Sequence, residues 1–217
     1  MTGKIKISDL IVTPSTVPGW PVKACVGLFC IGLVTLSLPL GVFGFGLFIY
    51  ICLILRVTIN PTLAVSRNET VYAPIDGRVI SVHESSDGNK TVTLQPDLFD
   101  SHIHYAPVAG QIEDIIWVDG SFKFNALDAV PNVTRVRREF NWRTTGGHYV
   151  ELTQFGSRWC RLLQCFLREG RQTTLSDPTG LALFRGAVMV TFTSSTPLNI
   201  IPGQRCLASQ TPLGQAG

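Results

Sequence analysis

Hydrophobic and polar positions divide the chain into an apolar N-terminal stretch and a longer part in which β-rich runs alternate with turn residues. Residues 24–55 are almost continuously apolar, with an interruption at Leu38-Pro39-Leu40-Gly41. Each half spans about 22 Å, short of a hydrocarbon core of about 30 Å. The pattern predicts a shallow or tilted membrane hairpin of two short helices over residues 21–55, joined around Pro39. The alternative is one spanning helix kinked at Pro39.

Positive charges flank both ends of this apolar stretch. Because such charges favour the cytoplasmic side, both ends are predicted to be cytoplasmic. The residues are Lys4, Lys6, Lys23, Arg56 and Arg67. The predicted organisation is a tail at 1–20, the hairpin at 21–55, a linker at 56–70 and a β domain at 71–213.

The pattern after residue 70 predicts antiparallel hairpins, because Asp-Gly or Gly-Gly pairs separate runs with high β-propensity. The runs 78–84 and 91–95 flank Asp87-Gly88, and 112–118 and 122–124 flank Asp119-Gly120. A third pair, 133–142 and 148–153, flanks Gly146-Gly147. Further strands are predicted at 180–184 and 188–192. The predicted class is therefore mostly β.

One turn occurs twice, 33 residues apart. Residues 73–79 read Ala-Pro-Ile-Asp-Gly-Arg-Val, and residues 106–112 read Ala-Pro-Val-Ala-Gly-Gln-Ile. Proline fixes φ, glycine permits a tight turn, and a β-branched residue follows at the start of a strand. Only the first copy carries an acid, Asp76, which is either a turn residue bonded to its own backbone or a functional group.

An apolar stripe predicts one amphipathic helix within the β domain. Its members recur at i, i+3, i+4, i+7 and i+8. The opposite side carries arginines, which are either solvated or turned toward anionic lipid headgroups. The stripe is Trp159, Leu162, Leu163, Phe166 and Leu167, and the arginines are Arg158, Arg161 and Arg168.

Composition excludes some classes of function. The net charge of +3 over 217 residues is too small to indicate nucleic-acid binding. The six cysteines form no Cys-x-x-Cys pair, so neither a zinc site nor a disulfide framework is predicted.

A dense polar cluster, Asp100-Ser101-His102-Ile103-His104, lies between the two Ala-Pro turns. On a strand, His102 and His104 share one face, a spacing that suits a metal ion. No clear third ligand accompanies them, so a metal-dependent enzyme is one alternative, and a buried strand histidine with a satisfied ring is another.

With these motifs in order, the chain resembles the short bacterial and archaeal phosphatidylserine decarboxylase proenzymes. The family stretch Ser/Ala-Pro-x-Asp-Gly-Lys/Arg-Val appears at 73–79, and Phe-Asp-x-His-x-x-x-x-Pro-x-x-Gly appears at 99–110. A Gln-x-x-x-x-x-x-Arg segment resembles 154–161, with Cys165 and Glu169-Gly170 in step.

The resemblance implies a barrel-sandwich-like β domain at a bacterial-type cell membrane, with phosphatidylserine as the lipid partner. The family converts phosphatidylserine to phosphatidylethanolamine and CO₂. Its pyruvoyl cofactor is formed when an internal Ser attacks the preceding carbonyl and the chain is cleaved. His102 is implied as the base for that Ser, with its ring oriented by Asp76.

The resemblance ends at the self-cleavage element Gly-x-Ile-Arg-Phe-Gly-Ser-Arg-Val. This chain has Gly186 in place of the pyruvoyl-forming Ser, and glycine has no hydroxyl. The tetrapeptide Phe155-Gly156-Ser157-Arg158 occurs upstream, where Ser157 is either a helix N-cap or a relocated nucleophile. Ser194 and Ser195 are further hydroxyls.

Three hypotheses follow from the sequence. The first is a membrane-associated decarboxylase-family protein that is not self-processed by the usual route. The second is a catalytically silent relative that binds an aminophospholipid or regulates an active enzyme. The third is the metal-dependent enzyme. A second copy of the chain, forming a homo-oligomer, is kept among the possible partners.

Overall fold

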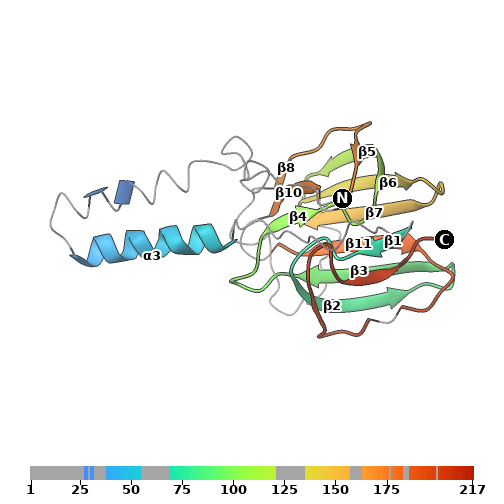
Figure 1. Ribbon diagram of the computed structural model, residues 1–217, viewed down its shortest axis with the longest axis horizontal. Coiled ribbons are helices and arrows are strands. Elements are labelled where there is room, and N and C mark those ends of the chain that lie inside the picture. Colours follow the sequence, from blue (N-terminus) through green and yellow to red (C-terminus); the bar gives the residue numbers. More distant parts are fainter. Residues whose placement is uncertain are drawn as a thin grey trace, which may run out of the picture. The chain divides into compact units, whose positions relative to one another are not determined.

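The computed structural model describes two compact units, residues 1–59 and 60–217, which are treated separately below (Figure 1). Its described residues are 27–28, 30–31, 38–54, 69–120, 135–156, 163–175, 177–182, 186–198 and 200–217.

The first unit contains helix α3, Leu38–Ile54. Its sequence is apolar throughout and includes Pro39 and Gly41 in the first turn. The residues predicted as the joint thus lie in the first turn of α3, and residues 32–37 before them lie outside the described residues. Proline is tolerated there because the first backbone N–H groups of a helix need no partner within it. Residues 27, 28, 30 and 31 are also helical, and the remainder of the predicted hairpin lies outside the described residues.

Helix α3 presents several apolar side chains at its surface, including Val42, Phe43 and Phe45. Among the helices that the structure describes, none combines the length and the apolar character needed to cross a membrane.

Within its described residues, the second unit is built from antiparallel strands in three sheets (Figure 1). The largest has the order β12-β2-β3-β11-β7-β6-β5-β9, the second β4-β10-β8, and the third β1-β13. The strands are β1 Thr70–Tyr72, β2 Gly77–Glu84, β3 Asn89–Gln95, β4 Ile103–Tyr105, β5 Gly110–Val118, β6 Arg137–Thr144, β7 Tyr149–Phe155, β8 Leu163–Cys165, β9 Gln172–Thr173, β10 Pro178–Ala182, β11 Val188–Thr193, β12 Arg205–Cys206 and β13 Pro212–Gln215.

One buried cluster forms the core of this unit and draws on both copies of the Ala-Pro turn. Ile75 and Val108, at equivalent places in the two turns, pack with Trp142, Leu152 and Val190 from the large sheet. The alternation of buried and exposed positions along β11 is the pattern expected of a strand with one core-facing side. The prediction of a mostly β domain is confirmed.

The two Ala-Pro turns have the same local structure as well as the same sequence pattern. A Cβ added to Gly77 would lie 2.4 Å from the carbonyl oxygen of Gln95, and one added to Gly110 would lie 2.4 Å from that of Arg143. Each glycine starts a long strand, β2 or β5, that carries a register shift two residues later. Both turns therefore need glycine for the same reason, the close approach of a neighbouring backbone.

The same offset of 33 residues recurs at the edges of the large sheet. Val79 accepts a backbone hydrogen bond from Gly203 (2.8 Å), and Ile112 accepts one from Gly170 (2.8 Å). Both donors have positive φ, 88° and 76°. Edge strand β12 thus pairs with β2 in the same way as edge strand β9 pairs with β5.

A reciprocal pair of backbone hydrogen bonds links the segments that contain the two Ala-Pro turns. The backbone N–H of Tyr72 donates to Pro107 and that of Tyr105 donates to Pro74, each at 2.8 Å. Each Ala-Pro turn is therefore fixed by the strand that precedes the other turn, which places the segment of Asp76 against the segment of His104.

Two of the three predicted hairpins are confirmed, β2–β3 around Gly88 and β6–β7 around Gly147, and both glycines have positive φ. The strands near 180–184 and 188–192 are confirmed as β10 and β11. The hairpin around Asp119 is not: β5 pairs with β6 and β9, and residues 122–124 lie outside the described residues.

The predicted amphipathic helix is wrong where the structure describes it. Residues 163–165 form β8, which pairs with β10 through Leu163 and Ala182. Leu163 is buried in a small cluster with Val136 and Ala182, whereas Leu167 belongs to the main core. The apolar residues thus serve two different clusters, and tertiary pairing overrides the helical spacing.

Candidate functional site

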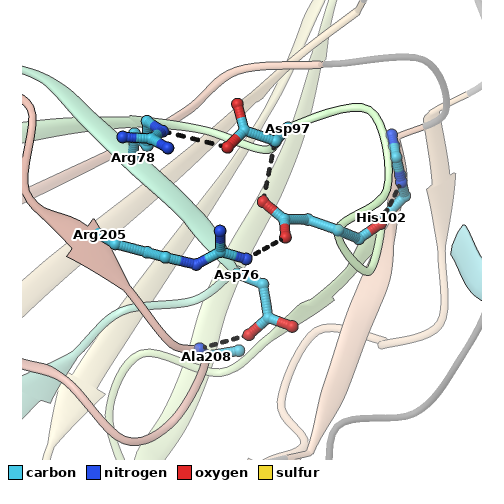
Figure 2. A network of polar contacts seen from close by, with 7 residues as sticks. Asp76, Arg78, Asp97, His102, Arg205 and Ala208 are labelled. Atoms are coloured by element: carbon cyan, nitrogen blue, oxygen red, sulfur yellow. Dashed lines mark hydrogen bonds and ion pairs between the residues drawn. The ribbon is translucent and has the colours of Figure 1, made fainter.

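The first Ala-Pro turn buries its acid. Asp76 is 3% exposed, and its Oδ1 accepts a 2.9 Å hydrogen bond from the backbone N–H of Ala208 (Figure 2). The turn between β1 and β2 positions this carboxylate, and the C-terminal segment after β12 supplies its donor. This contact joins the turn to a segment 132 residues further along the chain.

The ring of His102 is oriented by its own neighbour. Its Nδ1 lies 2.8 Å from the carbonyl oxygen of Asp100, which can only accept, so Nδ1 carries the proton (Figure 2). The orienting bond that the resemblance assigned to Asp76 is thus supplied by the backbone of Asp100. Burial lowers the pKa of His102, which keeps the ring neutral and able to accept a proton at Nε2.

The carboxylate of Asp100 is held from two directions. Its Oδ2 accepts the backbone N–H of Asp97 at 2.9 Å, and its Oδ1 accepts a hydrogen bond from Nη2 of Arg205 at 2.5 Å. Asp97 in turn accepts a bond from Nε of Arg78 at 3.1 Å (Figure 2). This network fixes the loop before β4 and therefore the backbone that orients His102.

Arg205 is one residue of this network that sequence reasoning missed. It lies 105 positions after Asp100, on an edge strand of only two residues, and no motif marks it. The sequence offered only a weak signal for Arg205. It lies two residues after Gly203, just as Gln172 lies two residues after Gly170, the glycine that bonds to the second Ala-Pro segment.

His104 is fully buried on β4, opposite Gly180 of β10. Burial, together with the neighbouring His102, lowers the pKa of His104 to about 3. Among the residues that the structure describes, no group of three or more His, Cys, Asp or Glu side chains is arranged to hold a metal. The predicted pair of His102 and His104 therefore has no third ligand within the described ranges.

Gly186 lies where two strands meet closely. A Cβ added there would be 2.7 Å from the carbonyl oxygen of Phe155 and 2.7 Å from the Cβ of Ala182. The backbone N–H of Phe155 also donates to Ala187 at 2.9 Å, so β7 is fixed against this position. A serine at 186 therefore requires movement of the surrounding backbone. The fallback nucleophile Ser157 and the arginines Arg158 and Arg161 lie outside the described residues.

Comparison with known proteins agrees with the family resemblance found in the sequence. The family described as phosphatidylserine decarboxylase matches residues 54–214. The proenzyme of Symbiobacterium thermophilum is 29% identical over 205 residues, 91% of this chain and 93% of its own length. That of Xanthobacter autotrophicus is 28% identical over 204 residues, 90% and 86% of the two chains.

The protein belongs to the phosphatidylserine decarboxylase family. The comparisons support the family reaction, decarboxylation of phosphatidylserine in phospholipid metabolism, and the proenzyme names imply a pyruvoyl group made from the chain. The residues of this chain do not fit that group at the expected position, because Gly186 has no hydroxyl and no space for a side chain.

Proposed function

We propose that this protein is a membrane-associated member of the family that remains uncleaved and binds an aminophospholipid without forming the pyruvoyl group by the usual route. Gly186 carries the proposal. The family reaction depends on a serine side chain there, whereas this backbone encloses the glycine between Phe155 and Ala182. The buried Asp76 and His102, with their supporting bonds, support a preserved headgroup site.

The mass of the full-length chain under denaturing conditions tests this proposal. We expect one species at 23.7 kDa and no CO₂ release from phosphatidylserine, because no hydroxyl is available at residue 186. The variant Ser157→Ala is the matched comparison. Two fragments from the original chain, with an intact chain from S157A, would contradict the proposal and identify Ser157 as the nucleophile. Fragments from both proteins would also contradict the proposal and would place the cleavage at another residue.

An exposed apolar patch beside the candidate site supports membrane contact by the β domain. The patch is Leu98 and Phe99, 47% and 62% exposed, in the loop that ends at Asp100. Arg78 and Arg205, both more than half exposed along their side chains, bind acids of the same loop. Apolar side chains bordered by guanidinium groups suit the boundary between acyl chains and anionic phosphates.

Replacing Phe99 with aspartate is expected to weaken binding to phosphatidylserine-containing vesicles about thirtyfold, because removing a phenyl ring from an apolar phase costs about 2 kcal/mol. Vesicle sedimentation measures this. Ile116→Asp, at a 43% exposed apolar position on β5, is the control and is expected to leave binding unchanged. Equal binding by F99D and the unaltered chain would show that the patch does not contact lipid.

A further inference from the structure

Of the buried polar atoms that lack a hydrogen-bond partner among the described residues, four belong to three side chains on or next to β4 and β10. They are Nε2 of His102, both ring nitrogens of His104, and Oε1 of Gln154. All three side chains are fully buried. Burying such atoms unpaired is costly, so a cluster of them indicates that something absent from the protein chain satisfies them.

The sheet register places His104 and Gln154 on one side. His104 lies opposite Gly180, so their side-chain directions point to the same face of the β4-β10-β8 sheet. A Cβ added to Gly180 would lie 3.2 Å and 3.3 Å from the two amide atoms of Gln154. The Gln154 amide therefore lies over Gly180, on the face of the sheet to which the His104 side chain points.

Two further residues border this place. His102 precedes His104 by two positions, and its carbonyl accepts a 3.4 Å hydrogen bond from the backbone N–H of Ala182, which continues the pairing of β4 with β10 and puts both histidine side chains on one side. Cys165 lies opposite Gly180 on β8, and its Sγ donates to the carbonyl of Leu167 at 3.3 Å. The thiol is thus already satisfied, whereas the histidines and the glutamine are not.

The unpaired atoms are mainly acceptors. The proton of His102 is on Nδ1, which leaves a lone pair on Nε2. The Nε2 of Gln154 donates to Oγ1 of Thr179 at 3.4 Å, which leaves Oε1 as the acceptor. His104 adds a lone pair in either neutral tautomer, and its low pKa keeps it neutral. Three acceptors with no positive charge suit a cation that carries several N–H groups.

We infer that His102, His104 and Gln154 form a binding site for a primary ammonium group, the amine of an aminophospholipid headgroup. The inference rests on the proposed function and gives its site a chemical selectivity. A primary ammonium has three donors for these three acceptors, and the remaining ring nitrogen of His104, which carries the proton, is a donor that the ammonium does not pair. A quaternary ammonium, with the same charge but no N–H, cannot satisfy any of them.

Calorimetric titration of the full-length chain in detergent tests this selectivity. The probes are glycerophosphoethanolamine and glycerophosphocholine, which share the phosphate and the net charge. We expect saturable binding of the first and none of the second. His104→Phe and Gln154→Leu are each expected to weaken binding about tenfold, the effect of losing one hydrogen bond to a charged group. Gln111→Leu, at an exposed glutamine, is the matched control and should bind normally.

Gln154→Glu separates loss of the site from loss of the fold. Its carboxylate accepts the same N–H and attracts the cation, so it should bind at least as tightly as the original chain. Equal binding of both probes, or unchanged binding by H104F and Q154L, would overturn the inference and leave water as the occupant. Vesicles of phosphatidylethanolamine and phosphatidylcholine distinguish the outcomes. If the protein prefers phosphatidylethanolamine vesicles but does not discriminate between the two soluble headgroups, only this inference is wrong. If it prefers neither kind of vesicle, the proposed binding of an aminophospholipid is wrong as well.

Discussion

Replacing Gly110 with alanine is expected to lower the free energy of unfolding by about 3 kcal/mol, the upper range for forcing an extra methyl into a packed interior. The new Cβ would lie 2.4 Å from the carbonyl oxygen of Arg143, and backbone cannot rotate away as a side chain can. Gly77→Ala should behave alike, because its Cβ would meet the carbonyl of Gln95 at the same distance. Urea unfolding followed by fluorescence measures both.

Gly147→Ala is the control for this steric argument. Its Cβ would meet nothing within 4 Å, but its φ is +86°, so only the left-handed conformation is penalised. That conformation costs an alanine about 1 kcal/mol. If G147A proved as destabilising as G110A and G77A, the close approach of the neighbouring backbone would not account for the effect at the two Ala-Pro turns.

Acid is expected to destabilise the protein steeply through His104. Its pKa is about 3 in the folded state, below the ordinary value of 6.5, because it is buried and lies near His102. Below pH 6.5 the unfolded chain binds a proton that the folded chain does not. The stabilising contribution is therefore complete above pH 6.5 and falls by about 1.4 kcal/mol per pH unit toward pH 3.

The comparison of His104→Phe with the original chain isolates this contribution from the carboxylates, which titrate in both. Unfolding free energies at pH 7, 5.5 and 4.5 should fall less steeply for H104F. His83→Gln, at an exposed histidine of β2, should retain the original slope. Parallel curves for H104F and the original chain would mean that the His104 ring is protonated as readily when folded as when unfolded.

Local turn chemistry explains which parts of the fold could be predicted from sequence. The hairpins at Gly88 and Gly147 join strands that are neighbours in the chain, and glycine in the left-handed region marks them. The pairings of β1 with β13 and of β12 with β2 join distant segments, and no local pattern specifies them. At Leu163 the local pattern was misleading, because pairing with β10 determined the structure.

Only part of the candidate site could likewise be predicted from the sequence. Asp76 and His102 were recognised because each lies in a motif of several residues. Arg205, Gln154 and Gly180 were not assigned roles in the site, since each contributes through a contact with a distant strand. The difference between Asp76 and Ala109, at equivalent places of the two Ala-Pro turns, was visible in the sequence and shows that only one half carries the acid.

The position of β11 determines how this protein would respond to a break in its backbone. β11 lies between β3 and β7 in the large sheet, whereas β10, just before it in sequence, belongs to another sheet. Residues 186–217 also supply β12 and β13, which pair with β2 and β1. A chain nicked between Ala182 and Gly186 would thus remain assembled as two interlocked fragments. Gel filtration or a native gel would then register one particle for nicked and intact protein alike, and only a denatured sample would tell them apart.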